Sequence, residues 1–257
     1  MAWLQVEQVD WIILLYVVLC MVFARNAAMG FNRYLDRDID AKNARTEGRE
    51  IPAGSISAKN ALWFVILNSL AFVAVTAAIN PLCFFLSPVA LLVILGYSFT
   101  KRFTALCHLV LGLGLALAPV GAYLAVTGKF ALAPVLLGIT VLTWVSGFDI
   151  IYALQDEEFD KENRLNSIPV MLGKRNALWV SVLLHVVTAG AIAGFALVSE
   201  GGWALWTGAG AFAALLVYQH LLVKPNDLSR VNLAFFTTNG VASVVFAAFV
   251  IADIFLR

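Results

Sequence analysis

The sequence contains few charged residues for its length. Asp, Glu, Lys and Arg make up 13% of its 257 residues, whereas average soluble chains hold about 25%. The 17 basic and 16 acidic side chains are too few to solvate a soluble protein of this size, and 61% of the residues are hydrophobic. A net charge of only +1 disfavours nucleic acid as a partner. The composition indicates a polytopic membrane protein that lies in a lipid bilayer.

Cysteine and histidine are also scarce. The 3 cysteines lie in apolar segments without the spacing of a metal or redox motif, which predicts buried small side chains. The 3 histidines, His108, His185 and His220, are each alone in their segment, which favours packing or local hydrogen bonds as their role. Neither residue type points to a metal or redox centre.

Long apolar runs dominate the chain instead. A helix that spans a bilayer needs about 20 mostly apolar residues, and this window finds eight segments, at about residues 11–33, 62–79, 81–97, 106–126, 135–154, 178–198, 206–223 and 233–255. Turn signals such as Asn80-Pro81 separate them. The sequence predicts an all-α, polytopic transmembrane helical bundle that forms a single membrane-embedded domain over residues 1–257.

The basic residues predict the orientation of this bundle. Most Lys and Arg side chains fall on loops of one face, while the opposite face holds Lys129 and Arg257. By the positive-inside rule the basic face is cytoplasmic, which places the N-terminus outside. Two acidic windows, at about residues 36–50 and 149–162, lie on the same face, and charge near a bilayer is usually functional. We therefore expect an integral protein of the inner (cytoplasmic) membrane whose active site faces the cytoplasm.

Oxygen-bearing side chains recur at helical spacing in both acidic windows. The first motif, spaced i, i+4 and i+8, is Asn32, Asp36 and Asp40. The second, spaced i, i+3, i+7 and i+11, is Asp149, Tyr152, Asp156 and Asp160. Each spacing predicts side chains along one face of a helix at the end of a span. Because Ile51-Pro52 and Ile168-Pro169 follow in matching places, we expect two pseudo-repeats, roughly residues 1–126 and 127–257.

Stacked carboxylates repel one another and need cations nearby. All-oxygen ligand sets select hard ions, and Mg²⁺ keeps coordination positions for water and phosphate oxygens. Basic residues near the motifs could bind the same anion: Arg33, Arg37, Arg45, Arg49, Lys101, Arg102 and Arg164. Acids, metal and basic side chains beside apolar helices predict a diphosphate site for a substrate with a long hydrocarbon tail. The alternative is a salt-bridge network that only solvates the helix ends.

Both motifs are typical of one protein family. With N-x-x-x-D-x-x-x-D, D-x-x-Y-A-x-Q-D-x-x-x-D and Arg45-Thr46-Glu47-Gly48-Arg49, essentially the whole chain resembles the UbiA superfamily of intramembrane aromatic prenyltransferases. The second motif is similar to the 4-hydroxybenzoate polyprenyltransferase branch. The first is also similar to the haem-farnesylating branch, which lacks the second D-x-x-x-D. The resemblance implies a nine-helix UbiA-like bundle, and this chain is expected to begin at the family's second helix.

The resemblance also implies ligands and substrates. One Mg²⁺ would be held by Asn32, Asp36 and Asp40, and another by Asp156 and Asp160. The substrates would be a polyprenyl diphosphate and an aromatic acid, bound by Arg33, Arg45, Arg49, Lys101, Arg102 and Arg164. Arg102 corresponds to a family arginine for the carboxylate of the aromatic acid. No obligate protein partner is expected.

The implied reaction is Mg²⁺-dependent transfer of the polyprenyl group to a ring carbon of a hydroxybenzoate-type acceptor in respiratory quinone biosynthesis. Tyr152 would shield the allylic carbocation, and Asp149 and Asp156 would orient a phenol or take the ring proton. Gly147-Phe148-Asp149 is also similar to relatives that prenylate 1,4-dihydroxy-6-naphthoate for menaquinone, which is an alternative acceptor. A secondary transporter is an alternative of another class, although transporter sites lie near the bilayer midplane.

Overall fold

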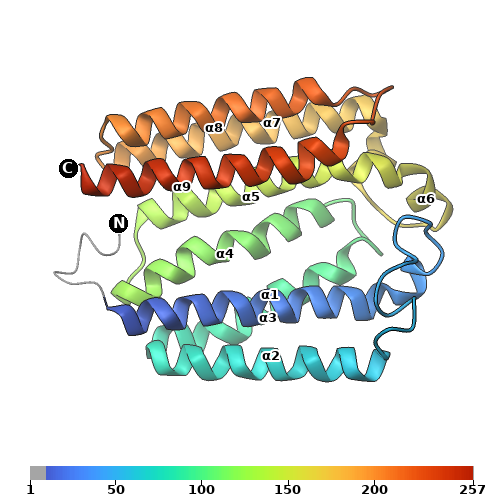
Figure 1. The fold of residues 1–257 in the computed structure, drawn as a ribbon, viewed down its shortest axis with the longest axis horizontal. Coiled ribbons are helices and arrows are strands. Elements are labelled where there is room, and N and C mark those ends of the chain that lie inside the picture. Colours follow the sequence, from blue (N-terminus) through green and yellow to red (C-terminus); the bar gives the residue numbers. More distant parts are fainter. Residues whose placement is uncertain (1–9, 257) are drawn as a thin grey trace. The chain divides into compact units, whose positions relative to one another are not determined.

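The computed structural model describes residues 10–256, and Figure 1 shows that helices make up most of this part. The α-helices are α1 (Trp11–Asp40), α2 (Ala58–Ile79), α3 (Pro81–Thr100), α4 (Cys107–Thr127), α5 (Leu132–Ala153), α6 (Glu157–Glu162), α7 (Ile168–Val198), α8 (Trp203–Leu222) and α9 (Asn239–Phe255). A 3-10 turn, Leu154–Asp156, joins α5 to α6, and a π-helix, Leu233–Thr238, leads into α9. Over residues 10–256, the single β-type pairing is an isolated bridge between Lys224 and Asp227.

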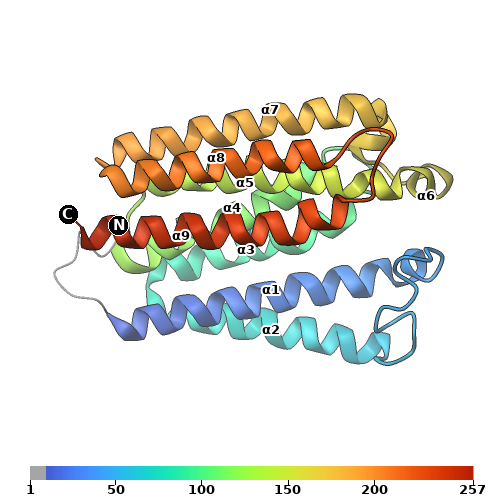
Figure 2. The ribbon, with the colours of Figure 1, turned by 45° about the horizontal axis from the view of Figure 1, so that its top comes forward.

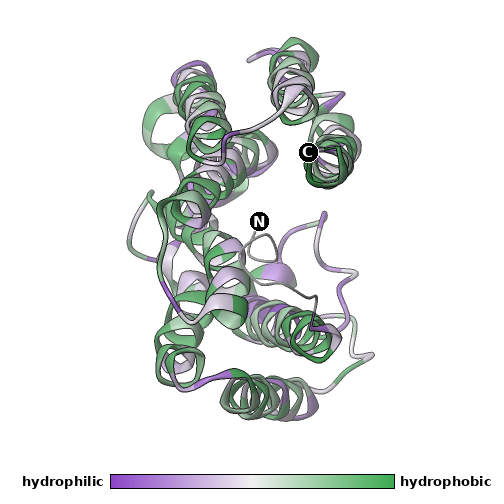
Figure 3. Ribbon diagram, turned by 90° about the vertical axis from the view of Figure 1, so that its left-hand side faces the viewer, coloured by the Kyte–Doolittle hydropathy of each residue, from purple (hydrophilic) through white to green (hydrophobic). Residues whose placement is uncertain are grey.

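Eight helical stretches in the described part are long and apolar enough to cross a membrane, which confirms the predicted spans. Large apolar side chains on these helices point outwards; on α3, Phe85 is 73% exposed and Leu92 is 75% exposed. Figure 3 shows hydrophobic residues along the helices and hydrophilic ones gathered in the connecting segments. Apolar surface of this extent is unfavourable in water and favourable in lipid. The chain is therefore an integral membrane protein.

The third helix shows how the sequence continues a span through a proline. Asn80 caps the first turn of α3 with its side chain and Pro81 occupies the first helical position, as the turn signal predicted. Pro88 lies inside the helix and has no N–H for the carbonyl group of Phe84. The hydroxyl group of Ser87 donates to that carbonyl at 2.8 Å. This substitute hydrogen bond satisfies a group that lipid could not.

Two helices extend well beyond the predicted apolar segments. The first, α1, continues to Asp40, so both acids of the first motif are helical. The second, α7, begins at Ile168 and has a non-helical backbone at Gly173, whose φ of 75° suits a residue without a side chain. A hydropathy window detects only the apolar part of a helix, whereas the backbone hydrogen bonds continue into its polar ends.

The chain divides into two compact units, and each is described by itself. The N-terminal unit comprises residues 10–103 and 121–130 of the described part; in it α1 packs along α2, and both contact α3 (Figures 1 and 2). The C-terminal unit comprises residues 104–120 and 131–256. In this unit α5 packs along α7, α7 contacts α8, and α8 packs along α9. The first acidic motif belongs to the N-terminal unit and the second to the C-terminal unit.

Small and polar residues bring α5 and α7 close together in the C-terminal unit. A Cβ atom on Gly147 would lie 2.3 Å from His185 Nε2, so only glycine fits there. The hydroxyl group of Ser181 donates to the carbonyl oxygen of Gly147 at 2.7 Å. Small residues and interhelical hydrogen bonds of this kind drive helix association in membranes. They hold the end of α5, which carries Asp149 and Tyr152, against α7.

Candidate functional site

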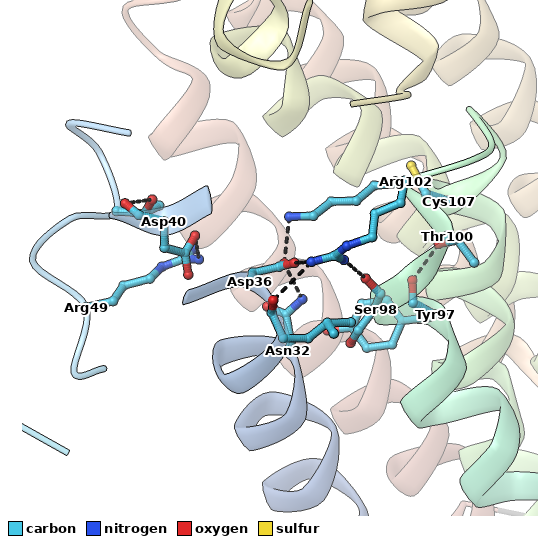
Figure 4. Close-up of polar contacts among 12 residues, drawn as sticks. Asn32, Asp36, Asp40, Arg49, Tyr97, Ser98, Thr100, Arg102 and Cys107 are labelled. Atoms are coloured by element: carbon cyan, nitrogen blue, oxygen red, sulfur yellow. Dashed lines mark hydrogen bonds and ion pairs between the residues drawn. The ribbon is translucent and has the colours of Figure 1, made fainter. Parts of the chain in front are cut away.

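The first acidic motif lies at the C-terminal end of α1, where the side chain of Asp36 is only 1% exposed. Asp36 Oδ2 lies 2.6 Å from Lys101 Nζ and accepts a hydrogen bond from Asn32 Nδ2 at 3.0 Å. Asp36 Oδ1 accepts a hydrogen bond from Arg102 Nη2 at 3.0 Å, as Figure 4 shows. Two cations therefore neutralise one buried carboxylate, and the i, i+4 pair of the sequence motif is formed.

Arg102 joins the end of α3 to α1. Its Nη2 also donates to the carbonyl oxygen of Leu35 at 3.0 Å, and its Nη1 donates to that of Ser98 at 2.9 Å. A planar guanidinium group provides several donors in fixed directions, which suits a residue that must hold three acceptors. Both Nη2 hydrogens are directed at α1, so Arg102 forms an ion pair with Asp36 itself. Only Nε–H and the second Nη1–H remain for the carboxylate of an acceptor.

Asp40, one helical turn further on, is paired on one side only. Its Oδ1 accepts a hydrogen bond from Arg49 Nη1 at 2.7 Å (Figure 4). The hydroxyl group of Thr46 donates to the Asp40 carbonyl oxygen at 3.1 Å and so ties the following loop to the helix end. Asp40 Oδ2 is buried and has no hydrogen-bond partner. Buried acceptors are nearly always paired, so this oxygen indicates a ligand position.

The side chains at the end of α1 fit a hard divalent cation in chemical type. Asn32, Asp36 and Asp40 offer amide and carboxylate oxygens, the ligands that Mg²⁺ prefers, and Asp40 Oδ2 is an atom that such an ion would satisfy. Over residues 10–256, no group of three or more His, Cys, Asp or Glu side chains is arranged to hold a metal ion. Binding at this position would therefore use oxygens of a ligand such as a diphosphate as well.

The second motif begins on α5 with Asp149 and Tyr152. Asp149 Oδ2 lies 2.7 Å from Nδ1 of His108, a residue of α4 in the same unit. The ring of Tyr152 stacks on Phe235, with ring centroids 4.0 Å apart, and meets the edge of Phe236. The motif therefore combines a carboxylate held by an imidazole with an aromatic surface one turn further along the helix.

Asp156 and Asp160 lie beyond the end of α5. The helix ends at Ala153, and Asp156 lies in the 3-10 turn while Asp160 lies on α6. The spacing predicted one uninterrupted α-helix, and the structure corrects this, because a 3-10 turn separates Asp149 and Tyr152 from Asp160. A 3-10 turn has about 3 residues per turn instead of about 3.6, so it changes the angular spacing of the side chains along the motif.

The other predicted basic residues lie on α1, in the loop after it and between α6 and α7. Arg33 pairs with Glu50 at 3.6 Å. Arg45 lies in the loop after α1, where its backbone N–H donates to Asn43 Oδ1 at 2.9 Å. Arg164 lies between α6 and α7 with a φ of 55°, an uncommon conformation for a residue with a side chain. Their role in binding an anion stays a prediction.

His108, the partner of Asp149, is a candidate site residue that the sequence alone did not indicate. His108 was expected to pack or to bond locally because it is alone in its helix. Its place at the start of α4 was nevertheless a signal, since the start of α4 and the end of α5 lie on the same predicted face of the membrane. A titratable residue at a helix end on the face that carries the acids is a candidate partner for one of them.

Comparisons with known proteins point to one family. The model of the UbiA prenyltransferase family matches residues 1–241. A 4-hydroxybenzoate octaprenyltransferase from Aliivibrio salmonicida is 32% identical over 243 residues, which cover 93% of this chain and 84% of that protein. The apo structure of a UbiA homolog from Aeropyrum pernix K1 has a TM-score of 0.88 at 28% identity and covers 96% of this chain and 91% of its own. A UbiA homolog from Archaeoglobus fulgidus bound to GPP and Mg²⁺ shares the fold, with a TM-score of 0.75 at 22% identity over 95% of this chain and 88% of its own.

Proposed function

Because the chain belongs to the UbiA prenyltransferase family, we propose that it transfers a polyprenyl group from a polyprenyl diphosphate to a ring carbon of a hydroxybenzoate-type acceptor. Family membership makes this membrane protein a prenyltransferase and not a secondary transporter. The acceptor class is supported by the similarity to 4-hydroxybenzoate octaprenyltransferases. The product would belong to respiratory quinone biosynthesis. We further propose an inner-membrane location with the reaction on the cytoplasmic side, which the distribution of basic residues supports.

The observation that carries this proposal is the buried Asp36 carboxylate between Lys101 and Arg102. A carboxylate removed from water needs compensating charge, and Lys101 and Arg102 supply it. Basic side chains gathered at one place also suit a diphosphate group. The neighbouring Asp40 oxygen without a partner favours a cation beside that anion.

The proposed Mg²⁺ ligands in the N-terminal unit are Asn32, Asp36 and Asp40. When bound, Mg²⁺ would neutralise negative charge on the leaving diphosphate. Lys101 and Arg49 would approach the diphosphate oxygens from the protein side, because both already direct positive charge at the acids of the motif. Asp156 and Asp160 stay the proposed ligands of a second ion.

The reaction exchanges one bond for another. The allylic C–O bond breaks and its electron pair leaves with the diphosphate, while the ring carbon ortho to the hydroxyl group supplies the electrons of the new C–C bond. The ring proton at that carbon then passes to a carboxylate, for which Asp149 and Asp156 are the candidates, and aromaticity returns. Asp149 is the proposed group that orients the acceptor's hydroxyl. The ring of Tyr152, backed by Phe235, offers a π surface to the allylic cation, and lipid around the helices keeps competing water away.

The test supplies the purified protein in detergent micelles with Mg²⁺ and a polyprenyl diphosphate. Separate reactions contain 4-hydroxybenzoate, 1,4-dihydroxy-6-naphthoate or no acceptor, and mass spectrometry follows the prenylated product while a coupled assay follows diphosphate release. We expect a product with 4-hydroxybenzoate that requires Mg²⁺. If a product forms with 1,4-dihydroxy-6-naphthoate but not with 4-hydroxybenzoate, the acceptor is the naphthoate of menaquinone biosynthesis. Folded protein that yields no prenylated product with either acceptor would overturn the proposal.

A further inference from the structure

His108 and Asp149 form a polar pair in the C-terminal unit, and of the two only Asp149 has a proposed role. His108 is 3% exposed, and its Nδ1 lies 2.7 Å from Oδ2 of Asp149, whose side chain is 24% exposed. The imidazole is thus enclosed, while the carboxylate reaches accessible space. The enclosed His108 ring cannot touch a substrate itself, so it can affect the reaction only through the Asp149 carboxylate that it holds.

The backbone at the start of α7 determines where the imidazole hydrogen lies. The N–H of Ile168, the first residue of α7, donates to His108 Nε2 at 3.3 Å. A backbone N–H can only donate, so Nε2 presents a lone pair and the hydrogen of the neutral ring is on Nδ1. Nδ1–H therefore donates to Asp149 Oδ2.

Close packing of α4 on α5 keeps the imidazole in this position. The hydroxyl group of Ser146 donates to the carbonyl oxygen of His108 at 3.0 Å. A Cβ atom on Gly112, one turn beyond His108, would lie 2.4 Å from both Leu142 O and Ser146 Oγ. The two helices therefore approach as closely as glycine allows. The hydrogen bonds from Ser146 and Ile168 hold His108 at its backbone carbonyl group and at its ring.

We propose that His108 is a positioning residue for prenyl transfer. It holds the Asp149 carboxylate by Oδ2, so that Oδ1 accepts the hydrogen bond of the acceptor's hydroxyl group and raises the electron density of the ring carbon that attacks. His108 takes no proton itself, because Nδ1 already carries one and Nε2 is bound by Ile168. This inference rests on the proposed function and adds to it the residue that orients the acceptor.

A double-mutant cycle tests whether His108 acts through Asp149. The variants are His108→Leu, Asp149→Asn and the double variant, assayed for kcat and for KM of the polyprenyl diphosphate. We expect His108→Leu to lower kcat about 10-fold to 100-fold, the usual cost of a misplaced catalytic group. The KM of the diphosphate should stay within about 3-fold, and His108→Leu should lower kcat by less than about 2-fold in the Asp149→Asn background. Independent, multiplicative losses would overturn the positioning role.

His108→Asn separates positioning from simple packing. The Asn amide nitrogen lies close to the position of Nδ1 and keeps a donor for Asp149, but it provides no acceptor for Ile168. Because the carboxylate stays in position, we expect this variant to recover kcat to within about 5-fold of the wild-type protein. The inference is contradicted if His108→Asn unfolds at the wild-type temperature and is still as slow as His108→Leu. This comparison does not require measurable turnover in Asp149→Asn.

A spectroscopic measurement needs no turnover. Protein with ¹⁵N-labelled histidine should show the His108 ring as the Nδ1–H tautomer, with its signals identified by their loss in His108→Asn. A hydrogen on Nε2 would overturn the inference. The two proposals can also fail separately. If the wild-type protein is active but the His108 and Asp149 losses multiply independently, only the role of His108 is wrong. If the folded wild-type protein forms no prenylated product, both the proposed function and the role of His108 are wrong.

Discussion

Arg102 Nη2 and Asp36 Oδ1 lie 3.0 Å apart, and this ion pair joins the residues that follow α3 to the end of α1. Both residues stand at the polar ends of apolar helices, where an uncompensated charge would be costly. The pair adds little net stability compared with apolar packing, but removing one partner leaves the other charge uncompensated. It therefore makes the arrangement of the two helices depend on the residues of the proposed site.

Replacing Arg102 by lysine should show the importance of the guanidinium fork. Lysine keeps the charge but cannot reach Asp36, Leu35 O and Ser98 O together. We expect Arg102→Lys to lower the free energy of unfolding by about 1–3 kcal/mol, measured by thermal unfolding in micelles. The matched control is Arg33→Lys, whose pair with Glu50 is looser and more exposed and should change stability by less than about 1 kcal/mol. Equal unfolding temperatures for Arg102→Lys and the wild-type protein would contradict this.

The α1 end also shows what a single sequence can predict. The i, i+4 spacing placed Asn32 beside Asp36 because helical geometry is local, and the hydrogen bond between them is present. The ion pair of Asp36 with Arg102 depends on how α3 packs on α1, which no local pattern contains. The same holds for His108 and Asp149, which are 41 residues apart.

The end of α5 marks the opposite case, where a local pattern was misleading. The spacing from Asp149 to Asp160 fits an α-helix, but the helix ends at Ala153 and a 3-10 turn follows. Three of the four acids from Asp156 to Asp160 lie in the first turn of a new helix, α6, where the helix dipole favours negative charge. Apolar content, in contrast, predicted all eight spans, because the requirement for lipid contact acts on every residue of a span.

Asp36→Asn should stop the reaction while the protein still inserts into the membrane. The amide removes the charge that balances Lys101 and Arg102 and that would bind Mg²⁺. We expect Mg²⁺-dependent diphosphate release to fall by more than about 100-fold. Asp38→Asn is the matched control, because Asp38 is an exposed acid on the same helix with only a 3.8 Å contact to Arg37. The assignment fails if both variants release diphosphate at the same rate.

Asp40 should couple metal binding to stability. Its Oδ2 is buried without a partner, so a cation that binds there stabilises the folded protein by mass action. We expect Mg²⁺ together with a non-hydrolysable diphosphate analogue to raise the unfolding temperature by about 2–8 °C. In Asp40→Asn the increase should disappear, and the metal-free protein should lose about 1–3 kcal/mol of stability because Arg49 loses its charged partner. An undiminished increase in Asp40→Asn would remove this residue from the proposed ligands.

The hydrogen bond of Ser87 should matter only because Pro88 follows it. Ser87 is 1% exposed and donates to the carbonyl oxygen of Phe84, which a proline at position 88 leaves without its helical donor. We expect Ser87→Ala to lower the free energy of unfolding by about 1–2 kcal/mol, because it leaves a buried carbonyl unpaired in lipid. In a Pro88→Ala background the same change should cost less than about 0.5 kcal/mol, since the backbone N–H of the new alanine can donate to Phe84. Unfolding of the four proteins in micelles measures this coupling, and an equal cost in both backgrounds would mean that Ser87 acts through packing alone. Since Lys101 and Arg102 follow directly after this helix, its continuity through Pro88 also determines where the two cations meet Asp36.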